Sequence, residues 1–328
     1  MMARAVANRS QFDAASASGH YESWFVRANH PERALAFWIR YTFFQPRARP
    51  DEACGEVWAI WFDGERQSVA AVKDAFQLAA CAVHDAPFAL TIGSSTMSED
   101  ALVGGTGARF SWRLACSASM PVLMLLPEEY YARSLPRAKA LVPAPNARFS
   151  GHLSVDGTRL DIHNWQGSQN HNWGSAHTDS YAWGQVAGFD GAPEVFLECA
   201  TARLKFGPWW TPALTLVVVR IGAEEYALNS LARAVRSQAR LGFFHWEIDA
   251  RARGVWITIR IHAPHWAFAG LRYANPPGGV KACLNTKLAA CELSIVRDGH
   301  DARTYQTRHR AAFEILTDRD DHGIPMLA

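Results

Sequence analysis

The chain of 328 residues is 49% hydrophobic, so it can bury a large core in one or two domains. Its 33 basic and 31 acidic side chains are dispersed, which disfavours a nucleic acid or another polyanion as a partner. Trp is unusually frequent, with 13 residues, and its large side chain suits the walls of apolar pockets.

Residues 1–20 are rich in Ala and Ser, and we expect them to be disordered. They contain no apolar core of signal-peptide length, and no run of about 18 apolar residues occurs in the chain. The cysteines lie far apart with no CxxC pair, which favours free thiols in a reducing compartment. We therefore expect a cytoplasmic protein with no integral membrane segment.

The first half reads as a series of short strands. The clearest are residues 36–44, residues 55–62 and the alternating stretch 108–116, and Asp63-Gly64 predicts a hairpin after the second. The Gly-rich stretch 104–107 lacks the Lys-Ser/Thr pair and the following helix of a phosphate-binding loop, so we expect a hairpin turn there.

Residues 127–147 contain four prolines among Arg and Lys, and no long regular element is expected at that density. We place a domain boundary here. The prediction is one β-domain over residues 21–145 and a second over residues 146–328.

The second half continues with strands separated by Gly, Pro or charged turns. Helical periodicity is limited to residues 230–240 and to a terminal helix at 303–316. Strands at roughly ten-residue spacing predict an all-β fold, as a barrel or a sandwich.

Two segments of the first half are faintly echoed in the second. Residues 57–72 are similar to 214–228, and residues 108–115 are similar to 254–263. Two related β-domains in tandem would explain the echo, and coincidence remains the alternative.

Residues 167–185, reading GSQNHNWGSAHTDSYAWGQ, form an unusual polar and aromatic stretch with no Lys, Arg, Leu, Ile or Val. We predict that this stretch lines the working end of a cavity. In a strand that begins at Asp179, the side chains of Tyr181, Trp183 and Gln185 would share one face with it.

Several motifs resemble one known family. They are GHLSVDG at 151–157, QNHNWG at 169–174, YAWGQ at 181–185, YANPPGGVKACLNTKLAA at 273–290, and the Pro-rich approach at 139–146. The chain thereby resembles the family of hydroxyneurosporene synthase (carotenoid 1,2-hydratase), with AttH-like proteins and tocopherol cyclase as relatives. The resemblance covers mainly residues 139–296.

The resemblance implies a pair of lipocalin-like antiparallel β-barrel or sandwich domains. It also implies long apolar substrates, often isoprenoid, and a chemistry in which an alkene is protonated and then captured by water or a hydroxyl, or cyclised. Some lipocalin-like relatives accelerate pericyclic ring closures by folding the substrate.

Such chemistry needs an acid kept protonated, aromatic walls that tolerate a cation, and amides that position water. The candidate catalytic residues are His171, Asp179 and Tyr181. The candidate substrate-binding residues are Asn172, Trp173, Trp183, Gln185, Glu22, Arg27 and Trp209.

Each candidate also has a structural interpretation. His171 and Asn172 would hold a bulge, Asp179 would sit in a turn, and the aromatic residues would belong to the core. Glu22 and Arg27 would lie in a surface turn.

We expect neither a metal nor another cofactor. The spacing of His163, His171 and His177 fits no standard metal site. No GxSxG motif and no strand–GxGxxG–helix unit occurs, which disfavours serine hydrolysis and nicotinamide or flavin chemistry.

The sequence therefore favours a cofactor-independent enzyme that hydrates, isomerises or cyclises an apolar, isoprenoid- or polyketide-like small molecule. The alternatives are a non-catalytic lipocalin-like carrier of a hydrophobic small molecule, and a structural module without an enclosed cavity.

Overall fold

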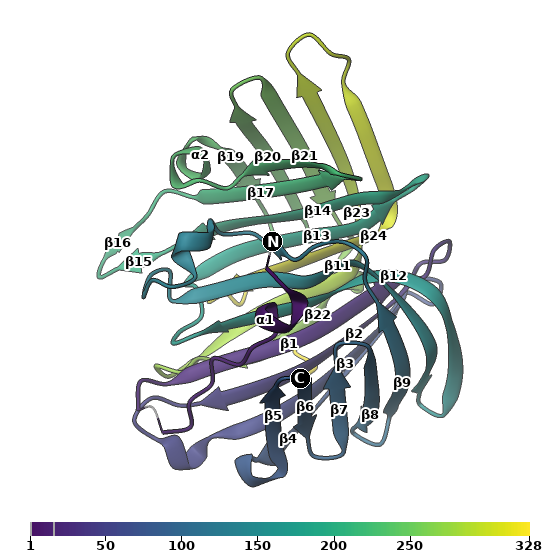
Figure 1. The fold of residues 1–328 in the computed structure, drawn as a ribbon, viewed down its shortest axis with the longest axis vertical. Helices are drawn as coiled ribbons and strands as arrows, with labels where there is room; N and C mark the ends of the chain where they lie inside the picture. The colour runs from purple at the N-terminus through teal and green to yellow at the C-terminus, as the bar shows by residue number, and fades with distance from the viewer. Residues whose placement is uncertain (1, 16) are drawn as a thin grey trace.

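The structure is a computed structural model that describes residues 2–15 and 17–328. Most of these residues belong to two large antiparallel sheets, which lie one above the other in Figure 1. Each sheet curls around an apolar core of its own. The predicted all-β fold with two lipocalin-like units in tandem and few helices is confirmed.

The first sheet has 12 strands in the order β4-β3-β2-β1-β12-β11-β9-β8-β7-β6-β5, with β10 paired to β11. These strands are β1 (His20–Asn29), β2 (Leu35–Gln45), β3 (Cys54–Asp63), β4 (Ser68–Gln77), β5 (Cys81–Asp85), β6 (Phe88–Ile92), β7 (Ser95–Ser98), β8 (Ala101–Thr106), β9 (Phe110–Ser117), β10 (Leu123–Met124), β11 (Ala138–Val155) and β12 (Thr158–Gly174). The predicted strands at 36–44, 55–62 and 108–116 correspond to β2, β3 and β9.

The second sheet has 10 strands in the order β18-β17-β14-β13-β24-β23-β21-β20-β19, with β22 paired to β23. These strands are β13 (Ser180–Phe189), β14 (Ala192–Arg203), β17 (Leu214–Ile221), β18 (Glu224–Leu228), β19 (Gln238–Leu241), β20 (His245–Ala252), β21 (Val255–His262), β22 (Ala269–Ala274), β23 (Val280–Arg297) and β24 (Arg303–Thr317). A separate two-stranded hairpin is formed by β15 (Lys205–Phe206) and β16 (Trp209–Trp210).

The two sheets repeat the same order of strands. Read from the β4 edge and from the β18 edge, β3 takes the position of β17, β1 that of β13, and β9 that of β21. The faint sequence echoes fall on equivalent elements, because they pair the β3–β4 hairpin with β17–β18 and β9 with β21. The echo therefore reflects a structural repeat.

The Pro-rich segment differs from expectation. Residues 138–155 form the long strand β11, although Pro143 and Pro145 lie within it. The register with β12 shifts between Leu141 and Ala144 and again between Ala144 and Ala147, so both prolines lie at interruptions of the ladder. Proline is tolerated in a sheet at such irregularities, because no ladder hydrogen bond is required of it there.

The predicted terminal helix at 303–316 is wrong, because these residues form β24. Phe313 and Ile315 join the core of the second sheet, while Leu316 packs between the sheets, and this two-sided burial overrides the helical propensity. The short helix expected at 230–240 is α2 (Leu231–Arg236). The remaining helical turns are α1 (Arg4–Ala7), η1 (Pro50–Glu52), η2 (Leu78–Ala80), η3 (Glu128–Tyr130) and η4 (His265–Ala267).

The division between the sheets lies between Gly174 and Ser180, and not at residue 145 as expected, because β11 and β12 complete the first sheet. The N-terminal segment also differs from the expected disorder. Its described residues include α1, and Ala7 and Asn8 are fully buried against the first sheet.

The two sheets meet through two apolar clusters. In the larger one, side chains such as Trp38 and Phe62 pack against Leu271 and Leu316 of the second sheet. In the smaller one, Leu123 and Val142 pack against Phe196 and Val218. These contacts fix how the sheets sit on each other.

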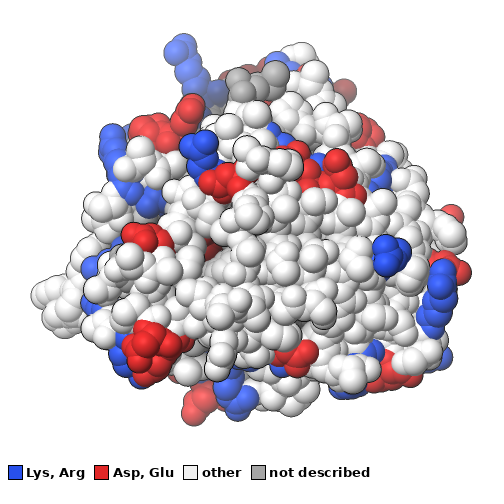
Figure 2. Space-filling model, turned by 60° about the horizontal axis from the view of Figure 1, so that its bottom comes forward, with Lys and Arg blue, Asp and Glu red and all other residues white. Residues whose placement is uncertain are grey.

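Charged side chains of both signs are interspersed around the face shown in Figure 2, and its centre is uncharged. No helix within residues 2–15 and 17–328 has the length and hydrophobicity needed to cross a membrane.

Candidate active site

A cavity of about 350 Å³ lies between the two sheets. Strands β1, β2, β11 and β12 supply one wall, and β13, β14, β17 and β24 supply the other. The lining is largely apolar, with Leu125, Leu141, Ala200 and Leu216 among its residues. At one end the lining is buried, and at the other it includes the exposed side chains of Leu135, Phe206 and Leu231, which mark the entrance.

The polar and aromatic stretch 167–185 is where the chain passes from one sheet to the other. Its first part ends β12 and its last part opens β13. It brings Asn172, His177, Tyr181 and Trp183 to the cavity, among others. This crossover lies at the boundary between the two sheets, where several of its side chains reach the space between them.

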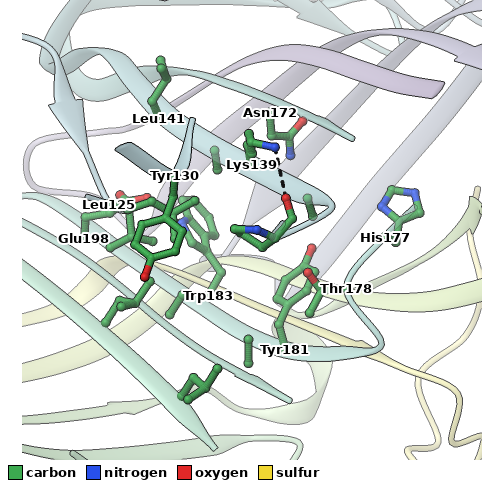
Figure 3. Close-up of a pocket in the computed structure, with 18 of the residues that line it drawn as sticks. Leu125, Tyr130, Lys139, Leu141, Asn172, His177, Thr178, Tyr181, Trp183 and Glu198 are labelled. Carbon is green, nitrogen blue, oxygen red and sulfur yellow. Dashed lines mark hydrogen bonds between the residues drawn. The ribbon is translucent and has the colours of Figure 1, made fainter. Parts of the chain in front are cut away.

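Glu198 on β14 is a buried carboxyl group at the cavity wall (Figure 3). The indole Nε1 of Trp183 donates a hydrogen bond to Oε1 at 2.7 Å, and Nε2 of Gln185 donates one to Oε2 at 2.7 Å. Burial raises the pKa of Glu198 to about 7, although these two donors and the charge of Arg27 oppose the rise. Glu198 is therefore partly protonated at neutral pH.

Glu314 on β24 lies on the other side of Trp183, with which it pairs across the strands. Its Oε1 accepts hydrogen bonds from Lys287 Nζ at 2.7 Å and from Asn285 Nδ2 at 2.9 Å. The ammonium of Lys287 also lies 5.3 Å from the centroid of the Trp183 ring. Trp183 therefore lies between two carboxyl groups. Glu198 accepts its hydrogen bonds from uncharged side chains, whereas Glu314 is paired with the Lys287 ammonium.

Tyr181 and Tyr273 line the cavity near Arg40. The guanidinium carbon of Arg40 lies 4.5 Å from the centroid of the Tyr273 ring. Burial raises the pKa of Tyr181 well above its usual value, so the phenol keeps its proton at neutral pH. This group supplies a hydrogen-bond donor and an aromatic wall.

His177 also lines the cavity, stacked between Tyr21, at 4.0 Å between ring centroids, and Tyr273, at 5.6 Å. Burial, together with the charge of Arg40, lowers its pKa to about 3. The ring is therefore neutral and lies 3.1 Å, through Nε2, from the carbonyl oxygen of Ala274.

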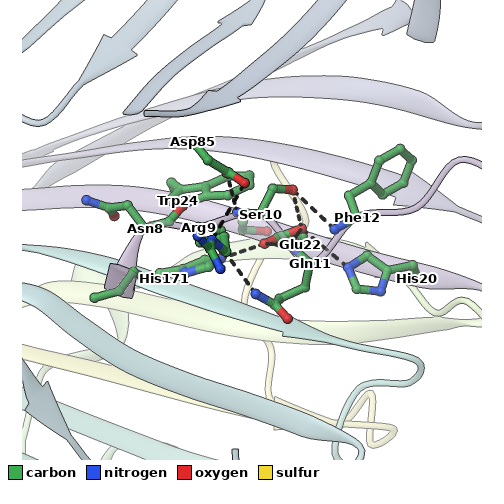
Figure 4. Close-up of polar contacts among 12 residues, drawn as sticks. Asn8, Arg9, Ser10, Gln11, Phe12, His20, Glu22, Trp24, Asp85 and His171 are labelled. Carbon is green, nitrogen blue, oxygen red and sulfur yellow. Dashed lines mark hydrogen bonds and ion pairs between the residues drawn. The ribbon is translucent and has the colours of Figure 1, made fainter. Parts of the chain in front are cut away.

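His171 reaches the cavity only as part of a buried polar cluster at the N-terminal segment (Figure 4). Its Nδ1 lies 2.7 Å from the carbonyl oxygen of Ala7, and its Nε2 lies 2.7 Å from Oε1 of Glu22. The ring stacks on Trp24, with 4.6 Å between centroids. Both nitrogens are occupied by acceptors, so the residue holds the N-terminal segment onto β1 and β12.

Glu22 accepts further hydrogen bonds from the backbone N–H of Gln11, at 2.9 and 3.0 Å, and from Ser10 Oγ at 3.1 Å. Burial would raise its pKa, but the hydrogen bonds, chiefly from His171, lower it to about 2. Glu22 is therefore an ionised structural partner of His171 and does not line the cavity.

The other predicted residues divide between the cavity and its surroundings. Asn172 and Trp183 line it, whereas Trp173 packs against the His171 ring at 4.7 Å. Arg27 and Gln185 lie beneath the wall, where Arg27 Nε donates to Gln185 Oε1 at 2.8 Å.

Asp179 and Trp209 do not line the cavity. Oδ2 of Asp179 accepts a hydrogen bond from the backbone N–H of Lys205 at 2.8 Å, immediately before β13. Trp209 is 77% exposed at the tip of the β15–β16 hairpin.

Residues 136–315 match the Tocopherol cyclase-like family over more than half of the chain. The chain belongs to the Tocopherol cyclase-like family. The predicted resemblance to tocopherol cyclase and its relatives is confirmed.

The chain is also similar to an uncharacterized protein of Mycobacterium tuberculosis, Rv0493c. The two are 25% identical over 279 residues, which cover 85% of this chain and 82% of the relative.

Solved structures share the fold at low sequence identity. A putative AttH from Nitrosomonas europaea superposes with a TM-score of 0.58 at 11% identity, covering 92% of this chain and 94% of that one. Kievitone hydratase from Nectria haematococca gives 0.60 at 10% identity, and CghA with Sch210972 gives 0.61 at 10% identity; each comparison covers 92% of this chain and 89% of the other.

Sequence reasoning missed Glu198, Glu314 and Lys287 in this member of the Tocopherol cyclase-like family. One signal was present for Glu198. It is the single charge in the apolar run VFLECA, whose alternating neighbours Leu197 and Cys199 face the core of the second sheet. A charged residue at that position had to face the space between the sheets.

The histidines considered for a metal site are separated in this family member. His163 is exposed on β12, whereas His171 is buried and His177 stacks between tyrosines. In the part of the chain that the structure describes, no three His, Cys, Asp or Glu side chains are grouped closely enough to hold a metal ion.

Proposed function

We propose that the chain is a hydratase- or cyclase-type enzyme that acts without a cofactor on an apolar substrate held between the sheets. The observation that carries the proposal is Glu198, a buried carboxyl group with a pKa raised to about 7 in an apolar, aromatic-lined cavity. A general acid works best when its pKa lies near the working pH.

The proposed reaction begins when Glu198 gives its proton to one carbon of a substrate alkene and becomes a carboxylate. The second alkene carbon becomes cationic, and the face of Trp183 stabilises it as aromatic faces stabilise other cations. Glu314, paired with the Lys287 ammonium, lies on the other side of Trp183.

The cation is then captured by water or by a hydroxyl group of the substrate, and the proton lost from that oxygen restores Glu198. Asn172 supports this step. The residue lines the cavity, and its buried Oδ1 has no donor within hydrogen-bonding distance among the described residues. An amide oxygen of this kind orients a hydroxyl without competing as a base.

The proposed acid is Glu198, in place of the predicted candidates His171 and Asp179. Both ring nitrogens of His171 already face acceptors, and Asp179 lies outside the cavity wall. Tyr181 keeps its predicted place at the substrate, as an aromatic wall and a hydroxyl donor.

The substrate class is proposed as isoprenoid- or polyketide-like. A volume of about 350 Å³ is within the range of small-molecule sites, roughly 300–1,000 Å³. The fold neighbours add support, because one is named a hydratase and another was solved with the small molecule Sch210972.

Incubation of the purified protein in D₂O with a panel of isoprenoid and polyketide-like alkenes tests the proposal. We expect deuterium at one alkene carbon of the product, and Glu198→Gln lowers its rate by about 10²-fold or more. The matched control is Glu56→Gln, because Glu56 also accepts a hydrogen bond from a Trp indole, Trp58, at 3.1 Å but lies outside the cavity.

Equal rates in Glu198→Gln and Glu56→Gln would remove Glu198 as the acid. Ligands that bind in native mass spectrometry but never acquire deuterium would favour the alternative, a carrier without chemistry. The structural module without a cavity is disfavoured by the cavity between the sheets.

A further inference from the structure

The entrance of the cavity carries an unusual concentration of exposed apolar side chains. Trp209 is 77% exposed, Phe206 57%, Leu231 56% and Leu135 53%. Phe206, Leu231 and Leu135 also line the cavity, so the exposed patch is continuous with the interior. Patches of this kind on soluble domains mark an interaction site.

Three segments form this patch, which we call the entrance surface: residues 130–137 (YYARSLPR), residues 203–210 (RLKFGPWW) and α2 (LARAVR). Each contributes at least one lining residue, so all three border the same opening. In Figure 1 the β15–β16 hairpin projects from the left edge of the molecule, with α2 nearby.

Within the three segments of the entrance surface every charged residue is basic, and the exposed Glu128 and Glu129 directly precede the first segment. The exposed basic residues of the entrance surface are Arg133, Arg137, Arg203, Lys205, Arg233 and Arg236. None of the three segments contains Asp or Glu, although acidic and basic residues are almost equal in number in the whole chain.

The basic groups lie among the aromatic ones. The guanidinium of Arg203 is 5.3 Å, and the ammonium of Lys205 5.8 Å, from the ring of Trp210. Exposed Trp side chains are favoured at the boundary between lipid headgroups and acyl chains, and neighbouring Lys and Arg side chains are attracted to anionic headgroups.

We propose that the entrance surface docks reversibly on an anionic lipid bilayer, so that the cavity opens directly onto the source of its apolar ligand. The ligand's delivery rests on the proposed function, whereas the docking itself needs no substrate. A soluble partner protein is disfavoured, because it would not account for a ligand path that runs through the centre of the contact.

Co-sedimentation with vesicles tests the docking. We expect the full chain to bind vesicles that contain phosphatidylglycerol, more weakly vesicles of phosphatidylcholine alone, and to be released by added salt. Trp209→Ala with Trp210→Ala should lower the partition coefficient by about tenfold or more, equal to about 1.4 kcal/mol.

Trp256→Ala is the matched control, because Trp256 is 41% exposed, as Trp210 is, but lies on β21 away from the entrance. For charge, Arg233→Gln with Arg236→Gln should weaken binding by about fivefold for each residue replaced. The charge control is Arg113→Gln with Arg253→Gln, two exposed residues on β9 and in the β20–β21 turn.

Absence of binding to anionic vesicles at low salt would overturn the proposal, as would equal losses in the entrance variants and their controls. The result is separable from the test of the chemistry. If the chain binds vesicles but Glu198→Gln leaves deuterium transfer unchanged, only the proposed function is contradicted. If Glu198→Gln lowers deuterium transfer but the chain does not bind vesicles, only the docking is contradicted.

Discussion

Glu22 and Glu198 are two buried carboxyl groups on strands of the two sheets, and their proton affinities are opposite. The pKa of Glu22 falls to about 2, while that of Glu198 rises to about 7. Glu22 accepts hydrogen bonds from a His side chain, a hydroxyl and a backbone N–H, whereas Glu198 accepts two from uncharged side chains. Burial alone thus favours the neutral acid, and the number and charge of the donors decide which group holds a structure and which can give a proton.

The largest expected effect concerns stability. Glu22→Gln should lower the free energy of unfolding by about 3–5 kcal/mol, because it leaves the buried His171 ring without its charged partner. Urea unfolding at pH 7 measures this change. Glu198→Gln should lower the free energy of unfolding far less, since the donors to Glu198 are uncharged. Equal losses in the two variants would contradict this explanation.

The next effect is the pH dependence of stability. Folding raises the pKa of Glu198 from 4.5 to about 7, so its contribution is fully present below pH 4.5 and is lost as pH rises through about 7. The loss is about 3 kcal/mol at about 1.4 kcal/mol per pKa unit. Unfolding of the wild type and Glu198→Gln between pH 4.5 and pH 8 should show this loss only in the wild type.

Glu22 gives the opposite sign. Folding lowers its pKa from 4.5 to about 2, so its contribution is present above pH 4.5 and is lost as pH falls through about 2. In a plot of the free energy of unfolding against pH, Glu22→Gln should therefore change the acid side, and Glu198→Gln the side near neutral pH.

The third effect is the pH dependence of the reaction rate. Deuterium transfer should decline above pH 7, by about tenfold per unit, as Glu198 loses its proton. His171→Gln, assayed at a temperature where it stays folded, should keep the same midpoint. A profile that loses its pH dependence in this variant would return the acid role to His171.

The smallest effect is a shift of that midpoint. Trp183→Phe removes the donor to Oε1 of Glu198, which stabilises the carboxylate, so the midpoint should move upward by about one unit or less. A downward shift would contradict the proposed role of the indole N–H.

Much of the fold could be predicted from periodicity and turn residues. The alternation in β9 and the Asp-Gly turns mark strands and hairpins by local rules alone. The strand β11 could not be predicted in this way, because its prolines are accommodated by register shifts that depend on β12. The helical pattern of residues 303–316 was misleading for a related reason, since burial on both faces of a central strand overrides local propensity.

The site was predicted in part. The stretch 167–185 indicated the cavity because its composition is unusual, and Asn172, Tyr181 and Trp183 line it. Glu198 and Glu314 were hidden in segments that read as ordinary strands, and only the pairing of β13 with β14 and β24 brings them beside Trp183. Residues joined by strand pairing have no fixed spacing in sequence, so a motif does not reveal them.

The repeated strand order has a consequence for how the cavity is built. One curled sheet supplies only one of the two walls, so the cavity exists only where the two sheets face each other. Strands in equivalent positions differ in charge there: β2 sends the cation Arg40 into the shared space, and β14 sends the acid Glu198. The repeat encloses the space, and the difference between equivalent strands makes its two walls chemically unlike.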